Sequence, residues 1–313
     1  MQPRLVEVSL HKILKPKGAT SYLLAVSGGA DSMAMLYAFH QLQSKIGFQL
    51  TVAHIHHGDQ INLSARDEAW SLVKSECERL KIPWFSNKKK RDDRVQSLGD
   101  SEAQLREFRR HQLKKILTLA QCQYVVMAQH ADDLLETRLI RLIRGVGSEG
   151  LVSMQMEKNA LLRPFLQLSR EDLRYYLEQV KGVWCEDPSN QQNKYLRNWI
   201  RNSWLPLLEK KHSGAVQSLT RSLESIAQSL THQPFETNCI ENQRLIRPLF
   251  LQLSLSDKRR VAAMYFGQCG ITNYGLSHIN ELIKRLDVEQ NELTFRLLKK
   301  NWRANARHIW FEE

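Results

Sequence analysis

The 313-residue sequence lacks any run of about 18 apolar residues, and this absence excludes a helix that crosses a membrane. Its first residues lack the apolar core of a secretory signal, so we expect no export from the cell. The five cysteines are widely spaced and never form a C-x-x-C pair, which argues against a disulfide framework, a zinc ribbon and an iron–sulfur site. We therefore expect a protein of the reducing cytoplasm, with no membrane partner.

Negative charge is also in short supply. Lys and Arg number 45 against 33 Asp and Glu, which gives a net charge of +12. This surplus favours association with polyanions such as nucleic acids, although a merely basic protein is the alternative at this point. With 42% hydrophobic and 25% charged residues, the composition is that of a folded protein. Because single hydrophobic cores stop growing near about 250–300 residues, we expect two domains.

Short apolar runs alternate with helical patterns over the first half of the sequence. The apolar runs predict buried strands, and the spacing of apolar side chains predicts helices between them. Strands are predicted at 22–26, 48–55, 82–85 and 124–128, and helices at 31–43, 64–80, 101–120 and 132–144. The alternation predicts an α/β fold with a doubly wound parallel sheet, whose ligands bind beyond the carboxyl ends of the strands.

The pattern changes after residue 150. Helices are predicted at 169–180, 195–208, 213–230, 257–266 and 276–286, and a hairpin at 293–298 and 306–311 around a Lys-Lys-Asn turn. The polar segment 231–242 marks a domain boundary. We predict a catalytic domain with a helical extension over 1–210, a connecting helix and linker over 211–242, and a smaller α+β domain over 243–313.

The strongest single motif is Ser27-Gly28-Gly29-Ala30-Asp31-Ser32, which lies between the first predicted strand and helix. Glycines there allow a tight turn with bare N–H groups, and the helix N-terminus adds about half a positive charge. The serine hydroxyls can donate to phosphate oxygens, and Asp31 can hold Mg²⁺. An ordinary turn with a serine cap is the alternative, but a chance match has a probability of roughly 10⁻³. We predict a nucleotide-phosphate site.

A second group of polar residues follows the fourth predicted strand. Asp132, Asp133 and Glu136 lie in the first turns of the next helix, near the sheet edge that carries the glycine turn. Asp132 and Glu136 are four residues apart and share one face of that helix. Carboxylates beside a phosphate site favour metal binding or proton abstraction, whereas helix capping is the alternative. Next to the glycine turn, we predict a catalytic role.

The glycine turn resembles the pyrophosphate loop of the PP-loop ATP pyrophosphatases. It is not a Walker motif, because no Gly-Lys-Ser/Thr follows. Within that superfamily, an ordered set of motifs resembles the tRNA(Ile)-lysidine synthetase family. The set comprises Val52 to Gly58, the helix with Glu102, Ala103, Arg106 and Arg109, His130 to Thr137, Arg144 to Leu151, Arg163-Pro164, Ser169-Arg170, Glu186 to Asn190, and Arg197-Asn198 with Arg201.

The sequence departs from that family's pattern at several positions. Gln129 stands where the family usually has a His, and Arg110 stands where an aromatic residue is usual. Leu134 replaces a Gln, and His56 replaces an Asn. These departures concern local substrate contacts and leave the acids and the glycine turn in place.

The resemblance implies a PP-loop, Rossmann-like fold and an ATP-dependent ligase that forms a C–N bond. The wobble cytidine of tRNA(Ile) with a CAU anticodon would be adenylated at its C2 oxygen. The ε-amine of free L-lysine would then displace AMP, giving lysidine and changing the tRNA from methionine to isoleucine specificity. The implied cofactors are ATP and Mg.

The resemblance also implies roles for individual residues. ATP would be bound by the Ser27–Ser32 turn with Arg144 and Gly145, and Mg by Asp31 and Glu136. Catalysis would fall to Asp132, Asp133, Glu136 and Arg201, with Asp132 or Asp133 as the general base. Binding of tRNA would fall to Arg106, Arg109, Arg197 and the domain at 243–313. For each arginine alone, a surface ion pair is the alternative.

Other classes of function are weighed against this one. A tRNA thiolase of the cytidine-modifying type would carry C-x-x-C pairs, which this sequence lacks. A non-enzymatic RNA-binding protein would have no need for a phosphate loop beside an acid cluster. The oligomeric state stays open, a homodimer included.

Overall fold

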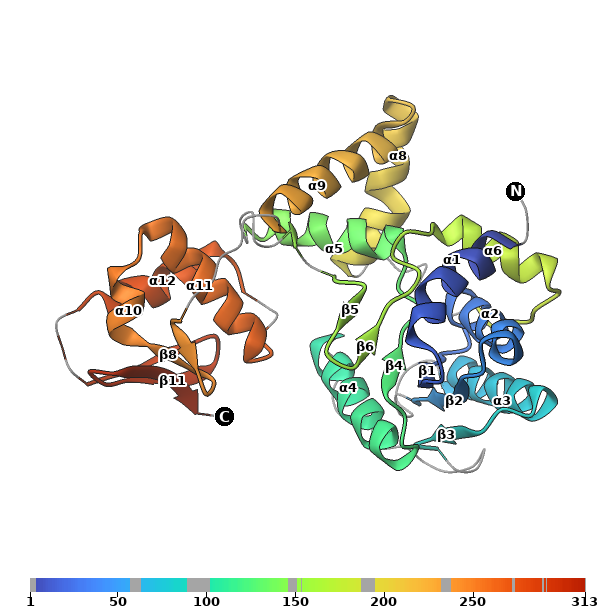
Figure 1. Ribbon diagram of the computed structural model, residues 1–313. Helices are drawn as coiled ribbons and strands as arrows, with labels where there is room; N and C mark the ends of the chain where they lie inside the picture. The colour runs from blue at the N-terminus through green and yellow to red at the C-terminus, as the bar shows by residue number, and fades with distance from the viewer. Residues whose placement is uncertain are drawn as a thin grey trace. The chain divides into compact units, whose positions relative to one another are not determined.

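The computed structural model describes residues 4–56, 63–88, 102–145, 151–152, 154–186, 195–231, 238–271, 274–288, 290 and 292–312. Its internal contacts divide the chain into two compact units, Met1–Leu134 with Met154–Ser203, and Leu135–Ser153 with Trp204–Glu313. Each unit contains its own β-sheet (Figure 1). The domain limits at 210 and 242 stay predictions.

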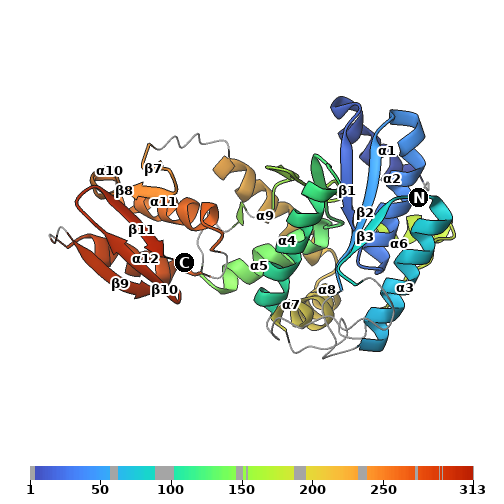
Figure 2. The same ribbon diagram turned by 90° about the horizontal axis from the view of Figure 1, so that it is seen from below.

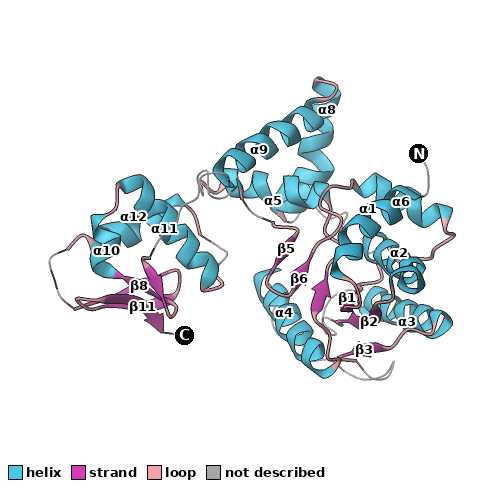
Figure 3. Ribbon diagram, viewed as in Figure 1, coloured by secondary structure: helices cyan, strands magenta, loops and turns pink. Residues whose placement is uncertain are grey.

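The described part of the first unit holds a six-stranded sheet in the order β3-β2-β1-β4-β6-β5. Neighbouring strands are parallel except for the short edge strand β5, which is antiparallel to β6. The strands are β1 (Ser21–Ala25), β2 (Gln49–His54), β3 (Trp84–Ser86), β4 (Tyr124–Val126), β5 (Glu157–Lys158) and β6 (Leu161–Leu162). The α/β class with a mostly parallel sheet is thus confirmed (Figure 3).

Helices cover both faces of this sheet. One face packs against α1 (Arg4–Leu14), α2 (Ala30–Ile46), α3 (Leu63–Leu80) and α6 (Arg170–Gln179) in a shared apolar core. The other face packs against α4 (Glu102–Leu119), and Figure 2 shows α4 across the sheet from α2 and α3. Helix α1 is not among the predicted helices, although Val6, Leu10 and Leu14 recur at helical spacing and are buried.

The strand order places the two chemical motifs side by side. The chain builds outward from β1 through β2 to β3, and then returns to the other side of β1 as β4. Ligands of doubly wound sheets bind at such a reversal point, beyond the carboxyl ends of the strands. The glycine turn follows β1 and the acid segment follows β4, so the topology brings both motifs to this point.

The second unit ends in a small α+β domain, as predicted. Its described residues form a five-stranded antiparallel sheet in the order β7-β8-β11-β10-β9. The strands are β7 (Ile240–Glu241), β8 (Arg244–Ile246), β9 (Leu293–Leu297), β10 (Lys300–Ala304) and β11 (His308–Glu312). The helices of this unit are α5 (Ala131–Ile143, from Leu135 on), α8 (Leu205–Lys211), α9 (Ala215–Thr231), α10 (Arg247–Gln252), α11 (Leu255–Gln268) and α12 (Leu276–Leu286).

The predicted hairpin near the C-terminus is wrong in its turn and its second strand. Leu298 and Lys299 form a two-residue turn with φ of +54° and +63°, so β10 begins at Lys300 and β11 adds a third strand. Two-residue turns with positive φ at both positions are usually filled by Asn-Gly. Leu and Lys carry no such signal, so the sequence pattern favours the Lys-Lys-Asn segment as the turn instead.

The structure bears on two expectations, which concern membrane-spanning helices and the state of the cysteines. Among the described residues, no helix has the length and apolar character needed to cross a lipid bilayer. All five cysteines are described, and each is a free thiol.

We predict that Trp302→Ala destabilises the C-terminal sheet. Trp302 is fully buried and its ring lies against those of Phe266, Phe295 and Phe311. Removing a buried indole leaves a cavity, so the free energy of unfolding should fall by about 3–5 kcal/mol. Urea denaturation measures the loss. Trp310→Ala is the control, because Trp310 is only half-buried, and an equal loss in both variants would contradict the prediction.

Candidate active site

The phosphate loop is closed on itself by a serine pair. The Ser27 N–H donates to the Ser32 hydroxyl at 3.2 Å, and the Ser32 hydroxyl donates to the Gly29 carbonyl at 2.9 Å. The two hydroxyl oxygens lie 3.1 Å apart. The first N–H groups of α2, which begins at Ala30, have no partner within the helix, and such groups bind phosphate oxygens.

The two glycines of this loop serve different purposes. Gly28 has a φ of +92°, and a Cβ atom there would lie 2.9 Å from the Cβ of Ala69 on α3. Gly29 has an ordinary φ of −76°, and the nearest atom to an added Cβ, the Ser27 hydroxyl oxygen, would be 3.7 Å away. The fold therefore requires glycine at Gly28, whereas Gly29 leaves open space beside the helix N-terminus.

A buried histidine positions the strand end that precedes the loop. The Nδ1 atom of His54, the last residue of β2, lies 2.9 Å from the carbonyl oxygen of Val26. Because a carbonyl can only accept, Nδ1 carries the proton. Burial lowers the pKa of His54 to about 4, so the ring is neutral at pH 7. The sequence analysis missed this role, although a histidine at the end of an apolar strand was visible.

The centre of the site is the buried imidazole of His130, which the sequence analysis also left without a role. Its Nδ1 atom lies 3.2 Å from Asp132 Oδ2, and its Nε2 atom lies 3.3 Å from Asp133 Oδ2 and 3.6 Å from Asp31 Oδ2. Burial by itself would lower the pKa of His130, but the interactions with Asp132, Asp31 and Asp133 raise it to about 10. The ring is therefore a cation at pH 7, and it connects the glycine turn to the acid segment.

The two aspartates at the start of α5 also hold backbone groups. Asp132 Oδ2 accepts the N–H of Arg170, the first residue of α6, at 2.9 Å. Burial would raise the pKa of Asp132, but the bonds from His130 and the Arg170 N–H lower it to about 2. Asp133 accepts the His130 N–H at 3.2 Å, so this side chain also caps the start of α5. Its other oxygen accepts from Arg201 Nη2 at 3.2 Å.

Arg201 reaches the acids from an irregular helical segment. The short helix α7 (Leu196–Trp199) continues directly into a π-helical stretch, Ile200–Trp204. π-Helical turns are rare and occur frequently at functional sites. The structure thus unites four of the predicted residues, Asp31, Asp132, Asp133 and Arg201, around His130.

The other predicted residues come from further positions in the chain. Glu136 is buried one turn further along α5, and Arg144 and Gly145 follow the end of that helix. Arg106 and Arg109 lie on α4, and Arg197 lies on α7. The structure does not describe the side chains of Glu102 and Ala103, or the motif residues 57–58, 146–150 and 187–190.

The cluster offers one oxygen to a metal ion. In the described ranges, no three His, Cys, Asp or Glu side chains are grouped as metal ligands. Asp31 Oδ1, however, is buried without a hydrogen-bond partner. Mg²⁺ is often held by one or two carboxylates together with substrate phosphates and water, so this single carboxylate beside a phosphate loop fits Mg²⁺.

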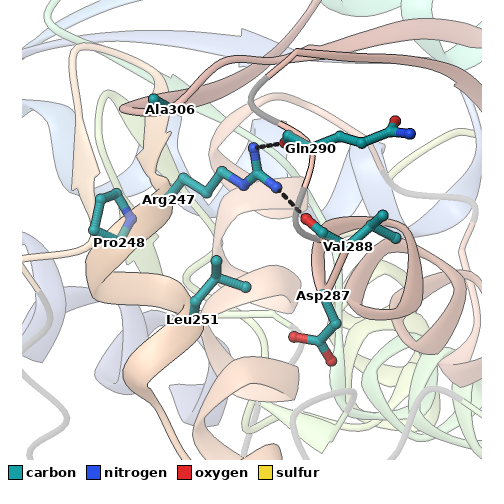
Figure 4. A pocket seen from close by; sticks show the side chains of 7 residues that line it. All are labelled: Arg247, Pro248, Leu251, Asp287, Val288, Gln290 and Ala306. Carbon is teal, nitrogen blue, oxygen red and sulfur yellow. Dashed lines mark hydrogen bonds between the residues drawn. The ribbon is translucent and has the colours of Figure 1, made fainter.

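A pocket of about 460 Å³ lies in the second unit, and its lining includes none of the candidate catalytic residues. The buried Arg247 at its wall donates to the carbonyl oxygens of Val288 and Gln290, each at 2.7 Å (Figure 4). These bonds hold the segment after α12 against α10, which is a structural role.

The parallel sheet, the serine-closed loop and the acid cluster define an ATP-using enzyme of the PP-loop class, and the family model for the PP-loop domain matches residues 3–208. A tRNA(Ile)-lysidine synthase from Bdellovibrio bacteriovorus is 35% identical over 307 residues, which cover 96% of this chain and 93% of that protein. The chain belongs to the tRNA(Ile)-lysidine synthase family.

Further relatives agree with this placement. Synthases of the same name from Actinobacillus pleuropneumoniae and Enterococcus faecalis are 30% and 31% identical over 87% and 71% of this chain. The chain spans only 65% and 46% of those two proteins. Among solved structures, the U34-tRNA thiolase NcsA from Methanococcus maripaludis superposes with a TM-score of 0.57 at 17% identity, covering 76% of this chain and 82% of that one. This likeness confirms the fold.

We predict that substitutions at the two neighbouring glycines affect different properties, stability for Gly28 and ATP binding for Gly29. Gly28→Ala should lower the free energy of unfolding by about 2–4 kcal/mol, because it combines a strained backbone with a clash against Ala69. Gly29→Ala should change stability by less than about 0.5 kcal/mol but weaken ATP binding, because its Cβ enters the space next to the phosphate-binding N–H groups. Thermal unfolding and ATP titration measure the two effects, and similar stability losses would contradict the assignment.

The raised pKa of His130 predicts a pH-dependent stability. A group whose pKa is higher in the folded than in the unfolded state stabilises the fold below the unfolded value, here about 6.5. This contribution should be lost as the pH rises toward the folded value of about 10. Denaturant titrations of the wild type between pH 6.5 and 10 should show the decline, and His130→Gln should lack it. A parallel decline in both proteins would exclude His130 as its source.

Proposed function

We propose that this chain joins free L-lysine to C2 of the wobble cytidine of tRNA(Ile) with a CAU anticodon, consuming ATP and releasing AMP and pyrophosphate. Membership of the family supplies the substrate class. The observation that carries the proposal is the ion-pair cluster of Asp31, His130, Asp132 and Asp133, which places an acidic site directly beside the phosphate loop.

The loop and the cluster attract opposite charges. The N–H groups at the start of α2 face the phosphates of ATP, as helix N-termini do in other nucleotide sites. Mg²⁺ would be held by Asp31 Oδ1, with Glu136 as a second predicted ligand, and would neutralise charge on the leaving pyrophosphate. Arg201 stands next to the same carboxylates and can stabilise negative charge on the adenylated substrate.

The cluster has carboxylates that can hold a lysine side chain. Asp132 and Asp133 lie next to the phosphate loop, and carboxylate oxygens accept hydrogen bonds from an ammonium group. Ion pairs at sites partly removed from water are stronger than pairs on the surface.

The attacking amine must first lose a proton. With an ordinary lysine pKa near 10.4, deprotonation at pH 7 costs about 4.6 kcal/mol. Asp132, with a pKa of about 2, is a weak base, and the protonated His130 cannot accept a proton. We therefore assign the general base to Asp133, and Asp132 to the positioning of His130 and of the first turn of α6.

The basic side chains outside the cluster are assigned to tRNA. Arg106 and Arg109 on α4, Arg197 on α7 and the domain at 243–313 are proposed to contact its phosphate backbone. Free thiols at all five cysteines support a cytoplasmic site of action. A homodimer stays a prediction.

The function is tested by incorporation of radiolabelled lysine into a tRNA(Ile) transcript with a CAU anticodon, in the presence of Mg-ATP. We expect incorporation with equal release of AMP, and none into a transcript with another anticodon. Release of AMP without lysine incorporation would keep the adenylation chemistry and overturn lysine as the nucleophile.

The two aspartates should differ in kinetics. Asp133→Asn should lower lysine transfer by at least about 100-fold while pyrophosphate release continues, because adenylation needs no base for the amine. Asp132→Asn should lower thermal stability, because it removes the negative charge that pairs with His130. It should retain more lysine transfer, because Asp133 is still present to accept the proton. Normal lysine transfer by Asp133→Asn would refute its assignment as the base.

A further inference from the structure

Two arginines of the first unit lack an acidic partner among the described residues. Arg163 donates through Nε to the side-chain oxygen of Gln129 and through Nη1 to the carbonyl oxygen of Gln155 at 3.0 Å. Both acceptors are neutral. Arg110 is exposed on α4, and within the described residues it forms neither a hydrogen bond nor an ion pair. The two cations thus have no carboxylate in contact with them in that part of the chain.

The two guanidinium groups influence each other. Burial of Arg163 lowers its pKa, and the nearby positive charge of Arg110 lowers it further. A partly desolvated cation next to a second cation is electrostatically unfavourable. An anion bound by both arginines would remove this repulsion.

The position of Arg163 links it to the catalytic site. The Met127 N–H donates to the Leu162 carbonyl at 3.0 Å, and His130 forms a parallel bridge with Phe165. The segment with Arg163 therefore runs alongside the segment from β4 to His130, at the carboxyl end of the sheet. Gln129, which holds Arg163, directly precedes His130.

Two departures from the family pattern meet at this place. Gln129 stands where a His is usual, and Arg110 where an aromatic residue is usual. In the structure Gln129 accepts a hydrogen bond from Arg163, and the positive charge of Arg110 lowers the pKa of Arg163. Arg110 thus puts a second cation where the family usually has an aromatic residue. Gln129 supplies the neutral amide that holds Arg163 in place.

We propose that Arg110 and Arg163 together bind a backbone phosphate of the tRNA next to the wobble nucleotide. This inference rests on the proposed function for its RNA substrate. Guanidinium groups bind phosphates through pairs of parallel hydrogen bonds, and a phosphodiester has two unesterified oxygens that two such groups can share. The phosphates of ATP have their own site after β1, so the RNA backbone is the anion that this position favours.

The test compares two charge-removing variants on one helix. Lys114 lies one turn beyond Arg110 on α4 and is equally exposed, so Lys114→Gln is a matched control for Arg110→Gln. Binding of an unmodified tRNA(Ile) transcript is measured at several salt concentrations, without ATP or lysine. Arg110→Gln should weaken binding by about tenfold. It should also reduce the salt slope of log Kd by about 0.7, the value for one phosphate contact on a single strand. Lys114→Gln should change neither quantity.

Several outcomes would overturn the proposal. Wild-type affinity and salt slope in Arg110→Gln, or the same losses in Lys114→Gln, would show that no specific phosphate is bound. An increased KM for ATP with unchanged tRNA affinity would assign the anion to the nucleotide instead. Because the binding assay needs no turnover, a wild-type chain that binds tRNA but transfers no lysine would contradict the proposed function and leave the phosphate site supported.

Discussion

The rest of the site depends on one buried cation, the imidazolium of His130. It holds together carboxylates from two helices that follow different strands, Asp31 on α2 and Asp132 and Asp133 on α5. Without this charge the acids would repel one another in a partly desolvated space, and some would have to take up protons. The imidazolium keeps them ionised and close together, and so fixes the distance between the phosphate loop and the acidic site.

The site needs two neighbouring regions of opposite charge. ATP needs positive charge and open backbone N–H groups, whereas an amine nucleophile needs negative charge. The reversal of strand order between β1 and β4 supplies both within one edge of the sheet, because each motif follows the end of its own strand. Gly28 and His54 keep the loop in place, one through its backbone conformation and the other through the bond to Val26.

Residue types alone predicted much of this arrangement. Apolar runs located β1, β2 and β4, and the glycine turn and the acids were recognised because their chemistry is local to short segments. The predictions failed where the signal was weak or distant. The turn at Leu298 and Lys299 uses residues that rarely adopt positive φ. Lys88 opens a run of seven charged residues, a pattern typical of a solvated loop, yet its side chain is buried and pairs with Asp67 from α3.

The sequence by itself determined the class of chemistry, since a phosphate loop after a strand and acids at the next helix N-terminus follow from local order. Only the tertiary structure decided which groups each acid contacts. Asp132 and Asp133 are neighbours of the same type, but one accepts the N–H of Arg170 and the other an N–H of Arg201. A pKa depends on the charges and hydrogen bonds that surround a group in space. Those neighbours come from segments up to 68 positions away in the chain, and the fold alone brings them together.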